Sequence, residues 1–171
     1  QKVFAEIDSL APEHALLASN TSTMSISEIA EATNRPEKVL GLHYFNPAVL
    51  MRLVEVIKAD KTSEETMQIG MAFAKKQKKV AVYVKRDTPG FIANRVNQAP
   101  AVLIGQIIER GEVEPEALDA FVRMTGAAMG PCELTDYVGV DVAVNVGRYF
   151  AQTLGPDYGP PPHLLKLMEE G

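Results

Sequence analysis

The chain has 171 residues, 46% of them hydrophobic and 23% charged, a composition typical of folded globular proteins rather than disordered ones. Its formal net charge of −5 offers no basic field to attract nucleic acid. The sequence contains no apolar run of about 18 residues and no basic segment leading into an apolar stretch at its start, so it predicts neither membrane insertion nor a secretion signal.

Strands and helices alternate in the first half of the sequence, a pattern typical of an α/β sheet. Capping boxes at Ser25 with Glu28, and at Thr62 with Glu65, predict where two of the helices begin. Gln1 lies inside an amphipathic helical pattern, so we expect this chain to be part of a longer one. The expected helices are residues 1–10, 26–32 and one opening at 62, and the expected strands are 15–19, 39–45, 53–57 and 80–84.

Only helical patterns follow the turn sequence Asp87-Thr88-Pro89-Gly90. Pro115 and Pro131 suit first-turn positions, and Asp141 suits an N-cap. We therefore predict two domains, an α/β domain over 1–88 and an all-α domain over 89–171. The expected helices of the second domain are residues 91–110, 115–125, 131–137, 141–153 and a last one around 164–168.

Two features have a structural and a functional interpretation. The basic run Lys75-Lys76-Gln77-Lys78-Lys79 ends a helical pattern, where cations favour the helix dipole, and a contact with phosphate is the alternative. The single cysteine, Cys132, excludes an internal disulfide and a cysteine-rich metal site, and we expect no metal. We interpret Cys132 as a small packing residue rather than a reactive thiol, since no histidine is near it in sequence.

Two polar residues interrupt otherwise apolar strands. His43 lies within Val39–Phe45, and Glu55 lies within Leu53–Ile57. A buried carboxylate needs a partner, and an imidazole can donate one N–H to it while its other nitrogen stays free. Twelve residues and a turn at Asn46-Pro47 separate the two, which permits neighbouring strands to bring them together. The pair then suits a general base; a structural hydrogen bond, or two edge residues that never meet, are the alternatives.

Five sequence motifs, including those that contain His43 and Glu55, provide further evidence through their order along the chain. They resemble, in order and spacing, motifs of the L-3-hydroxyacyl-CoA dehydrogenase family, over nearly the whole chain to about residue 154. Each motif alone is a weak signal, and their order makes the resemblance specific. The motifs are Leu17-Ala18-Ser19-Asn20-Thr21-Ser22, Gly41-Leu42-His43-Tyr44-Phe45-Asn46-Pro47, Leu53-Val54-Glu55-Val56-Ile57, Asp87-Thr88-Pro89-Gly90-Phe91-Ile92-Ala93-Asn94-Arg95 and Met129-Gly130-Pro131.

The resemblance implies a role for each site residue. His43 matches the catalytic base and Glu55 the carboxylate that orients it. Ser22 matches a serine near both the substrate oxygen and the nicotinamide, Asn94 a substrate contact, and Asn46 a nicotinamide contact. Without the resemblance, Ser22 is a loop or cap hydroxyl, Asn94 a helix-start residue and Asn46 the polar residue before a turn proline. Asn20 is a further candidate at the cofactor.

The sequence departs from the family pattern at both ends. It holds no Gly-x-Gly-x-x-Gly turn for dinucleotide phosphates and no Gly-Lys-Thr-Gly-like segment after its last helix. The resemblance therefore implies a fold made of a partial Rossmann-type NAD-binding domain followed by a helical C-terminal domain. We expect a fragment that carries the catalytic residues and is inactive in isolation.

For the complete protein the resemblance implies NAD-dependent oxidation of L-3-hydroxyacyl-CoA to 3-oxoacyl-CoA, in fatty-acid β-oxidation or 3-hydroxybutyryl-CoA metabolism. It also implies NAD as the cofactor, an acyl-CoA substrate and a homodimer formed through the helical domain. The expected compartment is the cytoplasm, or the mitochondrial matrix in a eukaryote. A related sugar-acid dehydrogenase and a non-catalytic binding or structural protein of the same fold are the alternatives.

Overall fold

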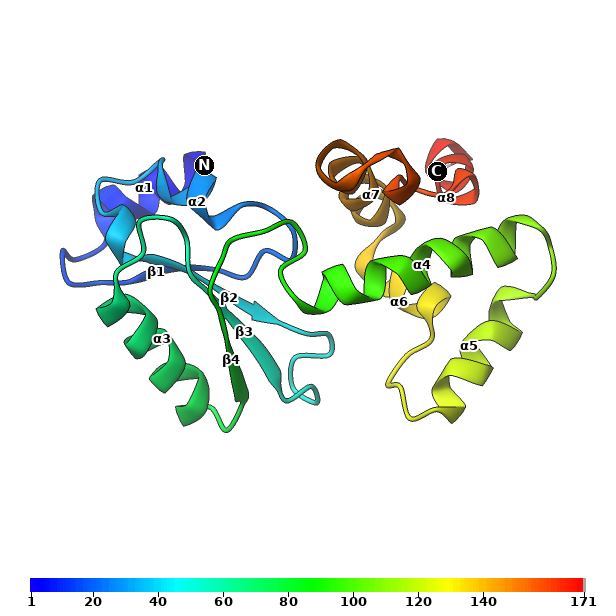
Figure 1. The fold of residues 1–171 in the computed structure, drawn as a ribbon, viewed down its shortest axis with the longest axis horizontal. Coiled ribbons are helices and arrows are strands. Elements are labelled where there is room, and N and C mark those ends of the chain that lie inside the picture. Colours follow the sequence, from blue (N-terminus) through cyan, green and yellow to red (C-terminus); the bar gives the residue numbers. More distant parts are fainter. Residues whose placement is uncertain (171) are drawn as a thin grey trace. The chain divides into compact units, whose positions relative to one another are not determined.

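The computed structural model describes residues 1–170. They form two compact units, the first spanning Gln1–Asn94 and the second beginning at Arg95. Strands and helices alternate in the first unit, and only helices follow it, so the predicted fold class is confirmed (Figure 1). The described residues include no helix that is both long and apolar enough to cross a membrane.

The first unit is built on a four-stranded sheet in the order β1-β2-β3-β4. β1 runs parallel to β2 and β3 parallel to β4, whereas β2 and β3 are antiparallel. The sheet is therefore mixed, and its central antiparallel pair joins two parallel pairs. In chain order the elements are α1 (Lys2–Leu10), β1 (Leu17–Ser19), α2 (Ile26–Ala30), the 3₁₀ turn η1 (Pro36–Lys38), β2 (Val39–Tyr44), β3 (Leu53–Ile57), α3 (Glu64–Lys76) and β4 (Val80–Val84).

Helices cover both faces of this sheet, as Figure 1 shows, and a separate apolar core lies on each face. Val39 and Ile57 pack with Ile26 and Ile29 of α2, whereas Leu40 and its neighbours pack with α3. Successive side chains of a strand point to opposite faces. His43 and Glu55 therefore lie on the same face as Val39 and Ile57, the face that α2 covers.

The helix starts follow the predicted capping rules at one position and depart from them at another. The hydroxyl of Ser25 accepts the N–H of Glu28, as predicted. The prediction that Thr62 caps the third helix is wrong, because its buried hydroxyl already donates to the Val39 carbonyl and accepts the N–H of Ala59. Ser63 caps α3 instead, by accepting the N–H of Thr66 at 3.1 Å.

In the described part of the second unit, all the regular elements are helices. Pro115 and Pro131 open α5 and α6 as predicted, but the prediction that Asp141 is an N-cap is wrong. Gly139 precedes α7, and Asp141 lies in the first turn of that helix. The negative charge of Asp141 still interacts favourably with the helix dipole there. The elements are α4 (Ala93–Glu109, which starts at the end of the first unit), α5 (Pro115–Met124), α6 (Pro131–Val138), α7 (Val140–Leu154), the 3₁₀ turn η2 (Pro156–Tyr158) and α8 (Pro162–Glu170).

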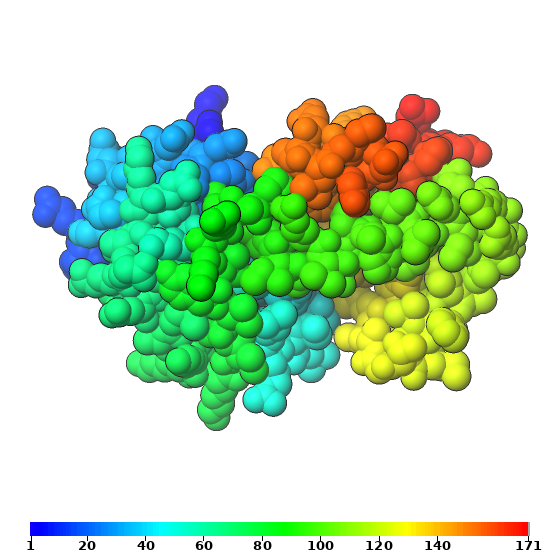
Figure 2. All heavy atoms as spheres, in the orientation of Figure 1, coloured from blue at the N-terminus to red at the C-terminus, as the bar shows by residue number. Residues whose placement is uncertain are grey.

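Close backbone contacts hold this helical unit together. A Cβ atom on Gly147 would lie 2.7 Å from the backbone nitrogen of Pro160, so only glycine allows α7 to approach that segment so closely. The carboxylate of Asp119 on α5 accepts the N–H groups of Cys132 and Glu133, both at 2.9 Å, and so caps α6 from a neighbouring helix. Much apolar surface stays exposed, including Leu103 on α4. The green spheres of Figure 2 show that the α4 region forms part of the visible surface.

Candidate active site

The structure brings His43 and Glu55 together at the centre of the sheet. The two residues face each other directly in the β2–β3 pair. Nδ1 of His43 lies 2.7 Å from Oε2 of Glu55, and the two residues are 4% and 1% exposed. An imidazole and a carboxylate are thus hydrogen-bonded inside an otherwise apolar core.

The chemistry of this pair fixes where the imidazole proton sits. An ionised carboxylate can only accept hydrogen bonds, so Nδ1 of His43 carries the hydrogen and donates it to Glu55. Nε2 of the neutral ring is then a free acceptor. When Nε2 takes up a proton, the adjacent carboxylate stabilises the imidazolium that forms. This geometry suits a general base with an orienting partner.

Glu55 has a second set of partners. Its other oxygen, Oε1, accepts the backbone N–H groups of Ile92 and Ala93, each at 2.9 Å. Burial alone raises the pKa of Glu55, but the hydrogen bonds from His43, Ala93 and Ile92 outweigh it, and the pKa of this carboxyl lies below its ordinary value. Glu55 is consequently ionised at neutral pH.

Aromatic rings surround the imidazole. The ring centroids of Phe45 and Phe91 lie 4.4 and 5.6 Å from that of His43, and Phe91 is 2% exposed. Apolar walls of this kind exclude water and restrict the rotation of the imidazole.

Ser22 and Asn94 also meet in the first unit. Nδ2 of Asn94 donates to the backbone carbonyl of Ser22 at 3.3 Å, so the contact does not use the Ser22 hydroxyl. Both residues are half-buried. Asn94 is the last residue of the first unit, six residues past the boundary expected from sequence. Ser22, His43, Glu55 and Asn94 therefore all belong to one compact unit.

The structure does not tie Asn46 to this cluster. Asn46 is exposed just after β2, and a cis peptide bond joins it to Pro47. Within residues 1–170 its side chain has no hydrogen-bond partner. Asn20, which follows β1, uses its Oδ1 to accept the N–H of Tyr44 at 2.9 Å. Because β1 and β2 are parallel, these two amides follow the same edge of the sheet, the edge where open α/β sheets bind ligands.

Sequence reasoning missed the contacts of Ile92 and Ala93, and the place of Phe91 beside the imidazole. Backbone N–H groups carry no sequence signal of their own. Gly90 was the one available indication, because glycine often precedes an irregular helix start. Gly90 and Phe91 both have positive φ, 74° and 51°, which is why α4 begins at Ala93 rather than at the expected residue 91.

The structure also shows the surroundings of Cys132 and of the basic run that ends at Lys79. Burial, with the nearby Asp119 carboxylate next in effect, raises the pKa of the Cys132 thiol, which disfavours the reactive thiolate. Lys79, at the end of the basic run, donates from its ammonium group to the carbonyls of Ala48 and Met51. Among the described residues, no group of three or more His, Cys, Asp or Glu side chains is arranged to hold a metal ion.

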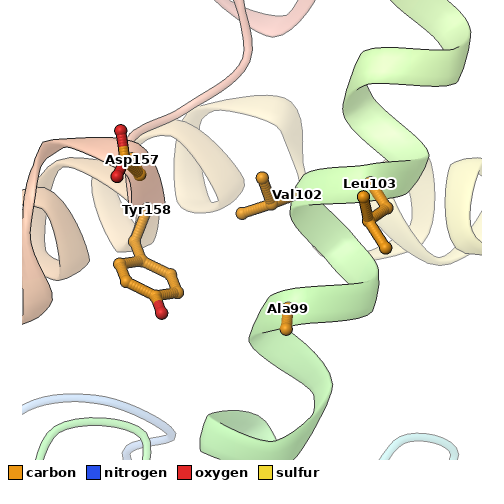
Figure 3. Close-up of a pocket in the computed structure, with 5 residues that line it drawn as sticks. All are labelled: Ala99, Val102, Leu103, Asp157 and Tyr158. Atoms are coloured by element: carbon orange, nitrogen blue, oxygen red, sulfur yellow. The ribbon is translucent and has the colours of Figure 1, made fainter.

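Two surface hollows lie apart from the His43–Glu55 pair. One, of about 380 Å³, is lined by Lys58, Glu64, Tyr83 and Lys85, beyond the ends of β3 and β4. The other, of about 260 Å³, lies in the helical unit between α4 and η2 (Figure 3). Its lining residues are Ala99, Val102, Leu103, Asp157 and Tyr158. Neither hollow contains a histidine that can act as a proton acceptor.

Two family models match the chain in sequence. The NAD binding domain of 3-hydroxyacyl-CoA dehydrogenase matches residues 1–88, and the C-terminal domain of the same family matches residues 90–171. Together they account for nearly every residue.

Named relatives agree with these matches. A probable 3-hydroxybutyryl-CoA dehydrogenase of Bacillus subtilis is 40% identical over 99% of the chain and 60% of its own length. The mitochondrial hydroxyacyl-coenzyme A dehydrogenase of Homo sapiens is 40% identical over 99% of the chain and 54% of its own length. The crystal structure of (S)-3-hydroxybutyryl-CoA dehydrogenase from Ralstonia eutropha superposes with a TM-score of 0.84 at 30% identity, covering 99% of this chain and 60% of that one. The chain thus spans little more than half the length of these relatives.

Proposed function

Because the chain belongs to the 3-hydroxyacyl-CoA dehydrogenase family, we propose that the protein carrying it oxidises L-3-hydroxyacyl-CoA thioesters to 3-oxoacyl-CoA with NAD. The names of the Bacillus and human relatives supply the substrate class. The observation that carries the proposal is the buried His43–Glu55 pair, with Nδ1 and Oε2 2.7 Å apart. Such a pair supplies the base that alcohol oxidation requires.

His43 is the general base in this proposal. Its Nε2 accepts the proton of the 3-hydroxyl group while C3 loses a hydride, so that the C–O single bond becomes a carbonyl. Bound NAD supplies the acceptor for that hydride. Glu55 keeps the imidazole in the tautomer that can accept a proton and stabilises the resulting imidazolium. In the reverse direction the same imidazolium returns the proton to the substrate oxygen.

In this proposal the remaining polar residues bind and align the substrate and the nicotinamide. Ser22 and Asn94 contact the substrate oxygen, and Ser22 and Asn46 contact the nicotinamide. The free amide of Asn46, beside the edge where β1 and β2 end, suits the carboxamide of a nicotinamide ring, because an amide can both donate and accept. The chain therefore offers residues for the reactive end of NAD.

A homodimer through the helical unit is part of the proposal. Val102, Ile104, Ile107 and Ile108 on α4 are all half-buried within the unit, whereas Val96 and Leu103 on the same helix are 68% and 59% exposed. Exposed apolar side chains in this number favour burial against another subunit. The setting we propose is fatty-acid or 3-hydroxybutyryl-CoA metabolism, in the cytoplasm or the mitochondrial matrix.

Consumption of NADH with acetoacetyl-CoA tests the proposal. The protein that carries this chain should turn over that substrate, and His43→Gln should lower turnover by about 100- to 10,000-fold, the usual contribution of a positioned proton-transfer group. His14→Gln is the matched control, since His14 is exposed. Near-wild-type turnover in a folded His43→Gln variant would refute the proposed base. Turnover of a sugar acid but not of acetoacetyl-CoA would favour the alternative substrate class.

A further inference from the structure

The start of α4 has an unusual backbone. Gly90 and Phe91 are consecutive residues with positive φ, at 74° and 51°. A glycine adopts this region freely, but a bulky residue such as phenylalanine does so at a cost in free energy. Such conformations persist only where surrounding contacts hold them. The contacts of this turn therefore show what determines its position.

Glu55 provides the most direct of these contacts. The N–H groups of Ile92 and Ala93, directly after the turn, both point at Oε1 of Glu55. The first N–H groups of a helix have no partner within it, and Ala93 is the first residue of α4. A buried carboxylate from β3 thus takes the place of a helix cap. The Phe91 ring packs on the same face, against the imidazole of His43.

Asn94 follows these two N–H groups directly. Its backbone position is set by the turn that Glu55 holds, and its side chain donates to the carbonyl of Ser22. The two oxygens of one carboxylate therefore lead to two different groups. Oε2 is hydrogen-bonded to the imidazole of His43. Oε1 accepts the N–H of Ala93, the residue that directly precedes Asn94.

We propose that Glu55 is a positioning residue for Asn94 as well as for His43, so that a single carboxylate fixes the base and the substrate-binding amide relative to each other. This inference rests on the proposed function only for the roles of the two positioned groups. The anchoring of α4 by Glu55 is a separate physical statement about the chain.

Substitutions can separate the two roles of Glu55, orienting His43 and anchoring the start of α4. In Glu55→Gln the amide oxygen can still accept both N–H groups of the turn, but the amide NH₂ now faces Nδ1 of His43 and favours the tautomer with hydrogen on Nε2. That variant keeps the start of α4 and disables the base. Glu55→Ala removes both anchors. His43→Gln removes the base and leaves the contacts of Glu55 with Ile92 and Ala93 in place.

Hydrogen exchange of the Ile92 and Ala93 amides tests the anchor in the protein that carries this chain. We expect Glu55→Ala to speed their exchange by about tenfold relative to amides of the buried strands, the factor that one net hydrogen bond is worth. Exchange in Glu55→Gln and His43→Gln should stay within about threefold of wild type. If Glu55→Ala does not fold, Glu55→Asp draws the oxygens back by one methylene and should also speed exchange. Unchanged exchange in the folded alanine or aspartate variant would overturn the proposal.

A double-mutant cycle with acetoacetyl-CoA tests the consequence for Asn94. Asn94→Ala should lower kcat/KM in the wild-type and Glu55→Gln backgrounds by similar factors, and by a much smaller factor in Glu55→Ala or Glu55→Asp, where Asn94 is already displaced. An equal factor in every background would overturn the proposal. Exchange needs no turnover, so an inactive wild type would refute the proposed function and leave the test of the anchor intact.

Discussion

The carboxylate of Asp87 accepts a 2.7 Å hydrogen bond from the hydroxyl of Ser25, 62 residues earlier in the chain. The same oxygen, Oδ2, accepts the backbone N–H of Ser27 at 2.7 Å. Asp87 thereby ties the loop that carries Ser22 to the segment that leads to Asn94. The link therefore joins the two segments that also meet in the Ser22–Asn94 contact.

Replacing Asp87 should loosen both segments. We expect Asp87→Ala to lower the free energy of unfolding by about 1–3 kcal/mol, the usual value of hydrogen bonds to a charged group. The KM for acetoacetyl-CoA should rise in the folded variant, because Ser22 and Asn94 lose a shared support. Urea unfolding and steady-state kinetics measure the two effects. Asp60→Ala, at an exposed position, is the control, and equal stability of the two variants would contradict the prediction.

The pKa of Asp8 predicts how stability changes in acid. The hydrogen bond from the backbone N–H of Asn34 has the largest effect and lowers this pKa. Burial raises the pKa in opposition, and the Arg35 guanidinium lowers it further. A carboxyl with a lowered folded-state pKa stabilises the fold fully above its ordinary value of 3.8, and this stabilisation is lost as pH falls through the folded pKa. The melting temperature of wild type should exceed that of Asp8→Asn by a constant amount above about pH 5 and by less below pH 3.8. A gap that widens in acid would contradict this sign.

Lys79 supports the loop next to Asn46 rather than facing solvent. Because its ammonium group binds the carbonyls of Ala48 and Met51, Lys79→Met should let this loop move. If Asn46 contacts the nicotinamide, the KM for NAD should rise by several-fold while kcat changes little. A rise of this size corresponds to about one lost hydrogen bond to a charged group. Lys75→Met, at an exposed position in the same basic run, is the matched control. Equal KM values for NAD in the two variants would remove Lys79 from this role.

Asp119 should be one of the most sensitive positions of the helical unit. It is 8% exposed and caps α6 from α5 through the N–H groups of Cys132 and Glu133. Asp119→Ala should lower the free energy of unfolding by about 1–2 kcal/mol, the usual cost of losing a helix cap. Asp136→Ala on the exposed face of α6 provides the comparison in thermal melts. Equal melting temperatures for the two variants would show that the cap adds no stability.

Much of the fold was predictable because its signals are local. Short apolar runs marked the strands, and Pro115 and Pro131 marked helix starts, since each preference acts over a few residues. Thr62 was misassigned because a neighbouring serine competes for the cap, and because the Thr62 hydroxyl donates to the carbonyl of Val39, which is distant in sequence. Asp119 gave no signal at all, because the helix that it caps lies further along the sequence.

The same distinction holds for the site. His43 and Glu55 stand out in sequence because each is polar where a strand is apolar, and a strand pair brings them together. The second task of Glu55 depends on the N–H groups of Ile92 and Ala93, and every residue type except proline has such a group. The sequence therefore predicted the pairing of His43 with Glu55, whereas the backbone contacts of Glu55 and the place of Phe91 came from the structure.

The separations along the chain imply an order of assembly. His43 and Glu55 are 12 residues apart, whereas 72 residues separate Asn94 from Ser22. Closing a longer loop costs more conformational entropy, so local pairings form ahead of distant ones. We expect the β2–β3 pair to form early in folding, already holding the imidazole beside its carboxylate. The contacts of residues 87–94 then close last, and an early intermediate would contain the His43–Glu55 pair without the Asn94 amide in place.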